Sequence, residues 1–123
     1  MGRSIVVLEK DPRLAKSLAG GLRPHFHLVD IAFSRDELLE KVVKTRAAAV
    51  VLDIECSRLS DVENLHRDFP ALPIVCTHRV PDEEMWMAAL EAGASDVCAS
   101  GDVDKVLTAV LRSLANAAAG LVA

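Results

Sequence analysis

The sequence predicts an α/β domain built on a doubly wound sheet of five parallel strands. Short runs rich in Val and Ile alternate five times with amphipathic stretches of helical spacing. Three of the apolar runs are almost uninterrupted, which is typical of parallel strands that helices cover on both faces. The predicted strands are Ser4–Leu8, His27–Ile31, Ala48–Asp53, Pro73–Thr77 and Asp96–Cys98.

The second predicted strand differs from the other four in its polarity. Asp30 interrupts it, and His25 and His27 lie at its start. We therefore expect this strand at an edge of the sheet, where one side is open to water.

Capping residues indicate where the predicted helices begin and end. Asp11 followed by Pro12 is typical of a helix start, and this first helix is expected to end near Gly20–Gly21. Two Ser–Glu pairs have the spacing of capping boxes, and a glycine is expected to end the fourth helix. These further signals are, in chain order, Ser34 with Glu37, Ser60 with Glu63, Pro70, Pro81–Asp82, Gly93 and Asp102.

Length, composition and charge fit one folded domain. The chain has 123 residues, of which 51% are hydrophobic, enough to bury a substantial core. Its net charge of −4 predicts no nucleic-acid surface. No apolar run approaches the ~20 residues of a membrane helix, and the N-terminus does not have the pattern of a signal peptide. We expect a cytoplasmic protein with no membrane contact, a domain over residues 1–118, and a tail or truncated linker over residues 119–123.

Acidic residues directly follow two of the predicted strands. Glu9 and Asp11 follow the first strand, and Asp53 ends the third. In a flavodoxin-like sheet of order 2-1-3-4-5, the carboxyl ends of these two strands adjoin at the ligand crevice. Carboxylates gathered there can bind a hard divalent cation and supply a nucleophile. Lys10, between the acids, is a cation where a metal site favours another oxygen ligand.

Several motifs, in the same order along the chain, resemble the receiver domain of two-component response regulators. Leu8–Pro12 is similar to the acid-acid-x-Pro signature of that family, and Val51–Asp53 is similar to its phosphoacceptor strand. Pro73–Thr77 resembles the strand that ends in a switch hydroxyl, and Ala89–Asp96 resembles the joint between the fourth helix and the fifth strand. The resemblance covers essentially the whole chain and implies the CheY-like (βα)5 sandwich.

The resemblance also implies roles for individual residues. It implies that Asp53 accepts a phosphoryl group from a histidine kinase, with Mg²⁺ bound by the acidic pocket of Glu9, Asp11 and Asp53. Glu55, in the loop after Asp53, is a further metal-ligand candidate. Thr77 corresponds to the switch hydroxyl that contacts the phosphoryl oxygens.

The sequence departs from the family pattern in two motifs. Lys10 stands where the second acidic residue is expected, and Ser100 with Gly101 stands where the family has Lys-Pro. A fixed ammonium repels a metal ion by ~4 kcal/mol at ~4 Å and an effective dielectric near 20. Ser100 is a candidate phosphate contact, but it brings no positive charge to a phosphoryl group. These departures predict a degenerate receiver, with no cofactor or only weakly bound Mg²⁺, that works through protein partners.

Lys10 leaves two interpretations open. Its ammonium could pair with Asp53 and Glu9 and so replace the metal, or it could point into solvent from its flexible stem.

A cluster of large apolar residues on the fourth predicted helix indicates an interaction surface. Met85, Trp86 and Met87 are consecutive, and successive helical positions rotate by about 100°, so the three cannot all face the core. Exposed apolar groups often mark an interface. In receivers the fourth helix, fifth strand and fifth helix mediate dimerisation, so the resemblance implies a homodimer through this face.

Two other functions are compatible with the acidic cluster. One is a working receiver, phosphorylated on Asp53 by a histidine kinase, in which Asp11 or Glu9 takes over metal binding. The other is a Mg²⁺-dependent phosphotransfer enzyme, because the acid-x-acid pair of Asp53 and Glu55 resembles motifs of haloacid-dehalogenase-like and Toprim-like folds. The chain has no cap insertion to shape a substrate pocket, so we expect a signalling module and not an enzyme.

The three cysteines all fall near the carboxyl ends of predicted strands, where a metal or redox site is conceivable. They are Cys56, Cys76 and Cys98, with His78 close by, and Cys76 and Cys98 lie in apolar strand contexts. Cysteine in such contexts behaves as a small hydrophobe, and we expect a structural role for all three.

Overall fold

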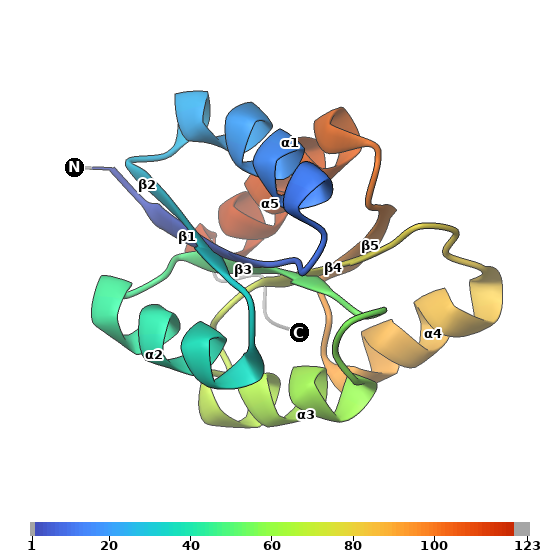
Figure 1. Ribbon diagram of the computed structural model, residues 1–123. Coiled ribbons are helices and arrows are strands. Elements are labelled where there is room, and N and C mark those ends of the chain that lie inside the picture. The colour runs from blue at the N-terminus through green and yellow to red at the C-terminus, as the bar shows by residue number, and fades with distance from the viewer. Residues whose placement is uncertain (1, 120–123) are drawn as a thin grey trace.

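Five parallel strands form one sheet, in the order β2-β1-β3-β4-β5, in the computed structural model of residues 2–119 (Figure 1). This architecture confirms the predicted fold class and strand order. The strand boundaries agree with the expected ones to within one residue or two. The strands are β1 (Ser4–Leu8), β2 (Leu28–Ala32), β3 (Ala49–Asp53), β4 (Ile74–His78) and β5 (Asp96–Ala99).

Helices cover both faces of the sheet. Figure 1 shows α1 and α5 on one face and α2, α3 and α4 on the other. This arrangement follows from right-handed crossovers between parallel strands. The helices are α1 (Pro12–Leu22), α2 (Arg35–Thr45), α3 (Leu59–Asp68), α4 (Glu83–Ala92) and α5 (Val103–Ala118), with a short 3₁₀ helix, η1 (Arg23–His25), after α1.

Side chains of the central strands alternate between two hydrophobic clusters, one beneath each helical layer. The cluster facing α1 and α5 includes Ile5, Val7, Val51, Val75 and Val110. The cluster facing α2, α3 and α4 includes Val6, Leu8, Val50, Leu52 and Ile74. Strands β1, β3 and β4 are buried on both faces, which explains why their sequences read as continuous apolar runs.

Strand β2 lies at the edge of the sheet, as predicted from its polar residues. Its Asp30 carboxylate accepts a hydrogen bond from the Lys41 ammonium at 2.8 Å, and the carbonyl of Ile31 accepts a second one from the same ammonium. The lysine therefore compensates the charge that the edge strand carries.

Four of the predicted helix caps are present. The side chains of Asp11, Ser34, Asp82 and Asp102 each accept a hydrogen bond from a backbone N–H in the first turn of the helix that follows. Gly93 ends α4 in the left-handed region, with φ of 118°, which a residue with a Cβ rarely adopts.

Two helix boundaries differ from the prediction. Helix α3 is not capped by Ser60 and Glu63: it begins at Leu59, and the Asp61 carboxylate reaches back to accept the N–H of Arg58 at 3.0 Å. Helix α1 continues through both glycines as far as Leu22, because Leu22 is fully buried in the core. A Cβ on Gly21 would collide with Val103 of α5, so the glycine permits the two helices to approach closely.

The last described helix ends close to the predicted start of the tail. Helix α5 ends at Ala118, and residue 119 lies in a turn; the rest of the predicted tail, residues 120–123, lies outside the described residues. Over the described part of the chain, none of the helices combines the length and the hydropathy that crossing a bilayer requires.

A buried carboxylate pocket at the carboxyl ends of the strands

The two-residue period of the strands brings four polar residues to one face of the sheet. One apolar row lies in the cluster beneath α1 and α5, and its members are Val7, Val51, Val75 and Cys98. The residues two positions further along the same strands are Glu9, Asp53, Thr77 and Ser100. The Cα atoms of Asp53 and Thr77 are register partners in β3 and β4. The same face of the sheet is therefore hydrophobic along the strands and polar at their carboxyl ends.

These four residues are almost completely buried. Their exposed fractions are 3% for Glu9, 4% for Asp53, 0% for Thr77 and 1% for Ser100. Within residues 2–119, Glu9 Oε1, Thr77 Oγ1 and Ser100 Oγ have no hydrogen-bond partner. Buried polar atoms are rarely left without a partner in proteins, because the loss of hydration is costly. Three such atoms at the carboxyl ends of neighbouring strands are therefore available to a polar group, water included.

In the described part of the chain, no basic side chain forms an ion pair with the carboxyl group of Glu9. Its Oε2 accepts the backbone N–H of Asp11 at 3.2 Å, and its Oε1 is unpartnered. Burial raises the pKa of Glu9 from 4.5 to about 7, the negative charge of Asp53 raises it further, and the Asp11 N–H opposes the shift. Glu9 therefore exchanges its proton near neutral pH.

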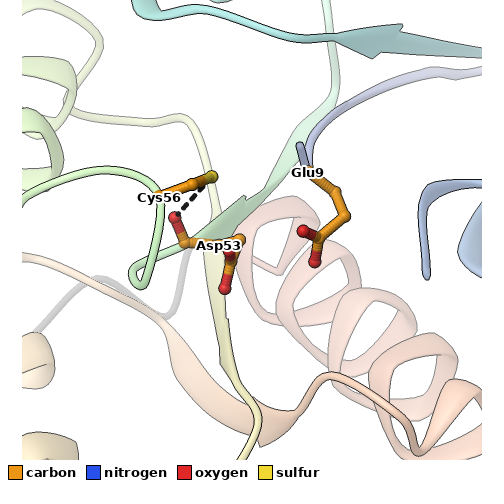
Figure 2. Close-up of side chains that lie close together, drawn as sticks. All are labelled: Glu9, Asp53 and Cys56. Carbon is orange, nitrogen blue, oxygen red and sulfur yellow. Dashed lines mark hydrogen bonds between the residues drawn. The ribbon is translucent and has the colours of Figure 1, made fainter. Parts of the chain in front are cut away.

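Asp53 is held by the loop that follows it. Its Oδ1 accepts the N–H of Glu55 at 3.4 Å, and its carbonyl accepts the Ser57 hydroxyl at 2.6 Å. The same carbonyl also accepts the thiol of Cys56 at 3.6 Å (Figure 2). Figure 2 shows the carboxyl groups of Glu9 and Asp53 on neighbouring strand ends.

Cys56 lies against the two carboxylates, which the sequence analysis did not predict. One donor atom each from Glu9, Asp53 and Cys56 lies within 4.8 Å of the others. Burial, followed by the hydrogen bond to Asp53, raises the pKa of the Cys56 thiol to about 11. The signal in the sequence was its position three residues after Asp53, where a loop can fold back over the strand end.

The other two cysteines take no part in this pocket. Cys76 points into the cluster beneath α2, α3 and α4, and Cys98 lies in the cluster on the opposite face. Burial raises the pKa of Cys76 to about 12 and that of Cys98 to about 11. Both occupy the hydrophobic positions that the sequence predicted for them.

Lys10 lies outside the carboxylate pocket. Its side chain is exposed, and no acidic group within residues 2–119 comes within 4.0 Å of its ammonium. It lines a surface cavity of about 320 Å³ together with Arg35, Cys56 and Arg58. Within the described residues, Lys10 therefore forms no ion pair with Asp53 or Glu9, which favours the interpretation in which its side chain extends into solvent.

The two remaining acidic candidates are engaged elsewhere. Asp11 is exposed, and its Oδ1 caps α1 by accepting the N–H of Arg13 at 2.9 Å. The Glu55 carboxylate accepts the backbone N–H of Arg79 at 2.6 Å. The side-chain Nε of the same arginine donates to both carboxylate oxygens, at 3.2 and 3.0 Å. These hydrogen bonds, the backbone one first, lower the pKa of Glu55. The structure does not bring either carboxylate into the donor cluster of Glu9, Asp53 and Cys56.

The pocket can therefore offer two carboxylates to a cation. Mg²⁺ needs near-octahedral oxygen coordination, and water would have to supply most of its ligands here. The unpartnered Glu9 Oε1 fits a cation, and the free hydroxyls of Thr77 and Ser100 fit the oxygens of a bound anion.

The apolar cluster of α4 is partly exposed, as expected from its spacing. Trp86 and Met87 are 48% and 56% exposed, Met85 is half-buried, and Leu90, one turn further, is 42% exposed. Ala89 is the buried residue of this helix. Helix α4 thus contributes an unusually apolar face to the surface.

Several solved structures share this fold. NtrX from Brucella abortus has a TM-score of 0.88 at 23% identity; the match covers 98% of this chain and 28% of NtrX, so this chain spans under a third of that protein. A putative response regulator from Chloroflexus aurantiacus has a TM-score of 0.84 at 22% identity, and the match covers 94% of this chain and 99% of that protein. A CheY-like protein, tadZ, from Pseudomonas aeruginosa has a TM-score of 0.75 at 27% identity, with 91% and 98% covered.

These similarities define the class of fold. The chain has the CheY-like fold of response regulator receiver domains, and the predicted resemblance is confirmed at this level. No protein-family model matches the sequence, and no curated protein is a significant match to it. Identities of this size establish the fold, and the function has to be argued from the pocket.

Proposed function

We propose that the protein is a receiver-like signalling module of a two-component system, with weak or absent Mg²⁺-dependent phosphorylation of Asp53. Its partner would be a histidine kinase or another signalling protein. One observation carries the proposal: among the described residues, the only carboxylate that clusters with buried Asp53 is that of Glu9, while those of Asp11 and Glu55 are engaged in other hydrogen bonds. The pocket thus retains the acceptor position of a receiver without the charges that drive phosphoryl transfer.

The charges around Asp53 disfavour Mg²⁺. Asp11 caps a helix, Glu55 is paired with Arg79, and position 10, next to Glu9, carries an exposed lysine in place of a further carboxylate. Two carboxylates, one of which is protonated for part of the time near neutral pH, are a weak ligand set for a cation that prefers several hard oxygen ligands.

The same pocket is also poor at neutralising a phosphoryl group. Over residues 2–119, no Lys or Arg nitrogen lies within 4.0 Å of the Asp53 or Glu9 carboxylate. The buried hydroxyls of Thr77 and Ser100 can donate hydrogen bonds to phosphoryl oxygens, but neutral donors stabilise a developing dianion less than an ammonium does.

Phosphorylation by acetyl phosphate tests this proposal. The purified chain is incubated with acetyl phosphate and Mg²⁺, and the intact mass is followed with time. We expect little or no gain of one phosphoryl group in the wild type. We expect a clear gain in the double variant Lys10→Asp/Ser100→Lys, which adds a carboxylate and a cation. Asp53→Asn in the double variant is the control and should remove the gain.

Rapid, stoichiometric phosphorylation of the wild type on Asp53 would contradict this proposal. It would favour the alternative of a working receiver in which Glu9 binds the metal. A double variant that folds, as judged by circular dichroism, and still gains no mass would show that the departures at positions 10 and 100 do not limit the reaction.

We further propose that the exposed face of α4, β5 and α5 binds a second copy of the chain. Trp86 and Met87 on α4 are exposed, and Trp86 lines a cavity of about 600 Å³ with Val97 of β5 and Arg112 of α5. Sedimentation should show a concentration-dependent dimer, and Trp86→Glu should weaken it at least tenfold, because a charge would be buried without a partner. A monomer at high concentration would argue against this surface.

A further inference from the structure

Cys56 adds a sulfur atom to the two buried carboxylates. Its Sγ and one oxygen each of Glu9 and Asp53 lie within 4.8 Å of one another (Figure 2). We propose that these three side chains form a site for a borderline divalent cation of the zinc type, which they bind in preference to Mg²⁺. The proposal concerns the same pocket as the proposed function, but it does not require Asp53 to be phosphorylated.

The spacing of the donor atoms suits one such ion. Zinc bonds are about 2.3 Å to sulfur and 2.0–2.2 Å to carboxylate oxygen, so two ligands of a tetrahedral ion lie about 3.3–3.8 Å apart. Donor atoms that are already within 4.8 Å of one another need side-chain movements of only about 1 Å. Cys56 lies on the β3–α3 loop, where such a movement does not disturb the sheet.

An independent observation is the set of unpartnered polar atoms in the pocket. Glu9 is 3% exposed, its Oε1 has no hydrogen-bond partner within residues 2–119, and it belongs to the donor cluster. Thr77, the register partner of Asp53, also has a buried hydroxyl without a partner. A cation would satisfy the glutamate oxygen, and the hydroxyl could bind a water or an anion in the open coordination position.

The hydrogen bonds of the loop leave the thiol free to act as a ligand. The contact from Cys56 Sγ to the Asp53 carbonyl is long, at 3.6 Å, and the Ser57 hydroxyl donates to the same carbonyl at 2.6 Å. If the sulfur turns to a metal and its proton leaves to solvent, the carbonyl keeps its better hydrogen bond.

The chemistry of the donors sets the preference between cations. Sulfur is a poor ligand for Mg²⁺, which needs near-octahedral oxygen coordination. Zinc accepts mixed sulfur and carboxylate ligands in a four-coordinate site, and three protein ligands leave one position open. Lys10 supplies no carboxylate, so the site has fewer oxygen ligands for a cation such as Mg²⁺. The sulfur of Cys56 is a ligand of the kind that zinc accepts.

Co²⁺ is the probe for this site because its absorption spectrum depends on the type and number of its ligands. Chelator-treated protein is titrated with Co²⁺, and absorption is recorded. We expect a thiolate-to-cobalt band in the near ultraviolet and the intense visible bands of a four-coordinate ion. Zn²⁺ should displace both, and Mg²⁺ in roughly hundredfold excess should not. Cys56→Ser should abolish the near-ultraviolet band and weaken Co²⁺ binding by at least about tenfold.

Cys98→Ser is the matched control, because this cysteine is buried in the core and should leave the spectrum unchanged. Circular dichroism verifies that each variant is folded. The inference is wrong if saturating Co²⁺ produces no near-ultraviolet band, if the band survives Cys56→Ser, or if Cys98→Ser removes it equally. Ready phosphorylation of Asp53 with Mg²⁺ would overturn the proposed function instead, while the cobalt spectrum alone decides this inference.

Discussion

Glu9 and Glu55 lie on either side of Asp53, and their environments are opposite. Glu9 follows β1, is 3% exposed and has one oxygen without a partner. Glu55 follows β3, and its side chain is 24% exposed and pairs with Arg79 at 3.0 Å. The pKa of Glu9 is raised to about 7, chiefly by burial, and that of Glu55 is lowered, chiefly by the Arg79 backbone N–H.

The difference shows which part of the pocket is built for structure and which is open to a ligand. Glu55 ties the β3–α3 loop to the β4–α4 loop, and all its charge is compensated within the chain. Glu9 is compensated only by one backbone N–H, at a cost to stability. A group bound at this side of Asp53 would offset that cost, and the proposals for this site therefore rest on Glu9 and not on Glu55.

The largest expected effect is that of Glu9→Gln on stability. A raised pKa means that ionised Glu9 destabilises the folded chain; the penalty is absent below about pH 4.5, grows as the pH rises, and is complete above about pH 7. Gln removes the charge and keeps an acceptor for Asp11. At about pH 8 in chelator, the variant should be more stable by about 1–3 kcal/mol in urea denaturation. A gain of the same size at about pH 5 would refute the electrostatic explanation.

Thr77→Val is expected to have a smaller effect in the same direction. Valine keeps the shape of threonine and removes the buried hydroxyl that lacks a partner. The variant should gain about 1 kcal/mol, because an unsatisfied buried polar group is costly. Thr45→Val is the matched control, since the Thr45 hydroxyl donates to the Lys41 carbonyl at 2.8 Å. If both variants change the free energy of unfolding by the same amount, the missing hydrogen bond of the Thr77 hydroxyl is not the cause of the gain.

The smallest effect is expected at Glu55. A lowered pKa contributes stability above the ordinary value of 4.5, and this contribution is lost as the pH falls through the folded-state pKa. The Arg79 partner is 75% exposed, so Glu55→Gln should cost less than about 1 kcal/mol at neutral pH, and less still at high salt. A double-mutant cycle with Arg79→Ala measures the pair, and additive effects would show that it contributes nothing.

The sequence predicted the parts of the site that follow from strand periodicity. Glu9, Asp53 and Thr77 occupy positions that alternate with buried apolar residues, so their convergence at one end of the sheet follows from the strand order. It could not predict Glu55, whose partner Arg79 is separated from it by 24 positions. The mistaken cap of α3 has a similar origin: Asp61 competes with Ser60 and Glu63 for the same turn, and only the packed helix decides.

By itself, the sequence determined the alternation of strands and helices, because hydrophobic periodicity and capping residues act over short distances along the chain. The strand order, and with it the place where the acidic residues meet, came from the likeness to flavodoxin-like sheets and receiver domains. The tertiary structure decided what the pocket contains. It turned Lys10 to the surface, paired Glu55 with Arg79 and placed the sulfur of Cys56 against Glu9 and Asp53. These outcomes depend on loop conformation and on charges brought together from distant segments, which the local pattern of residues does not encode.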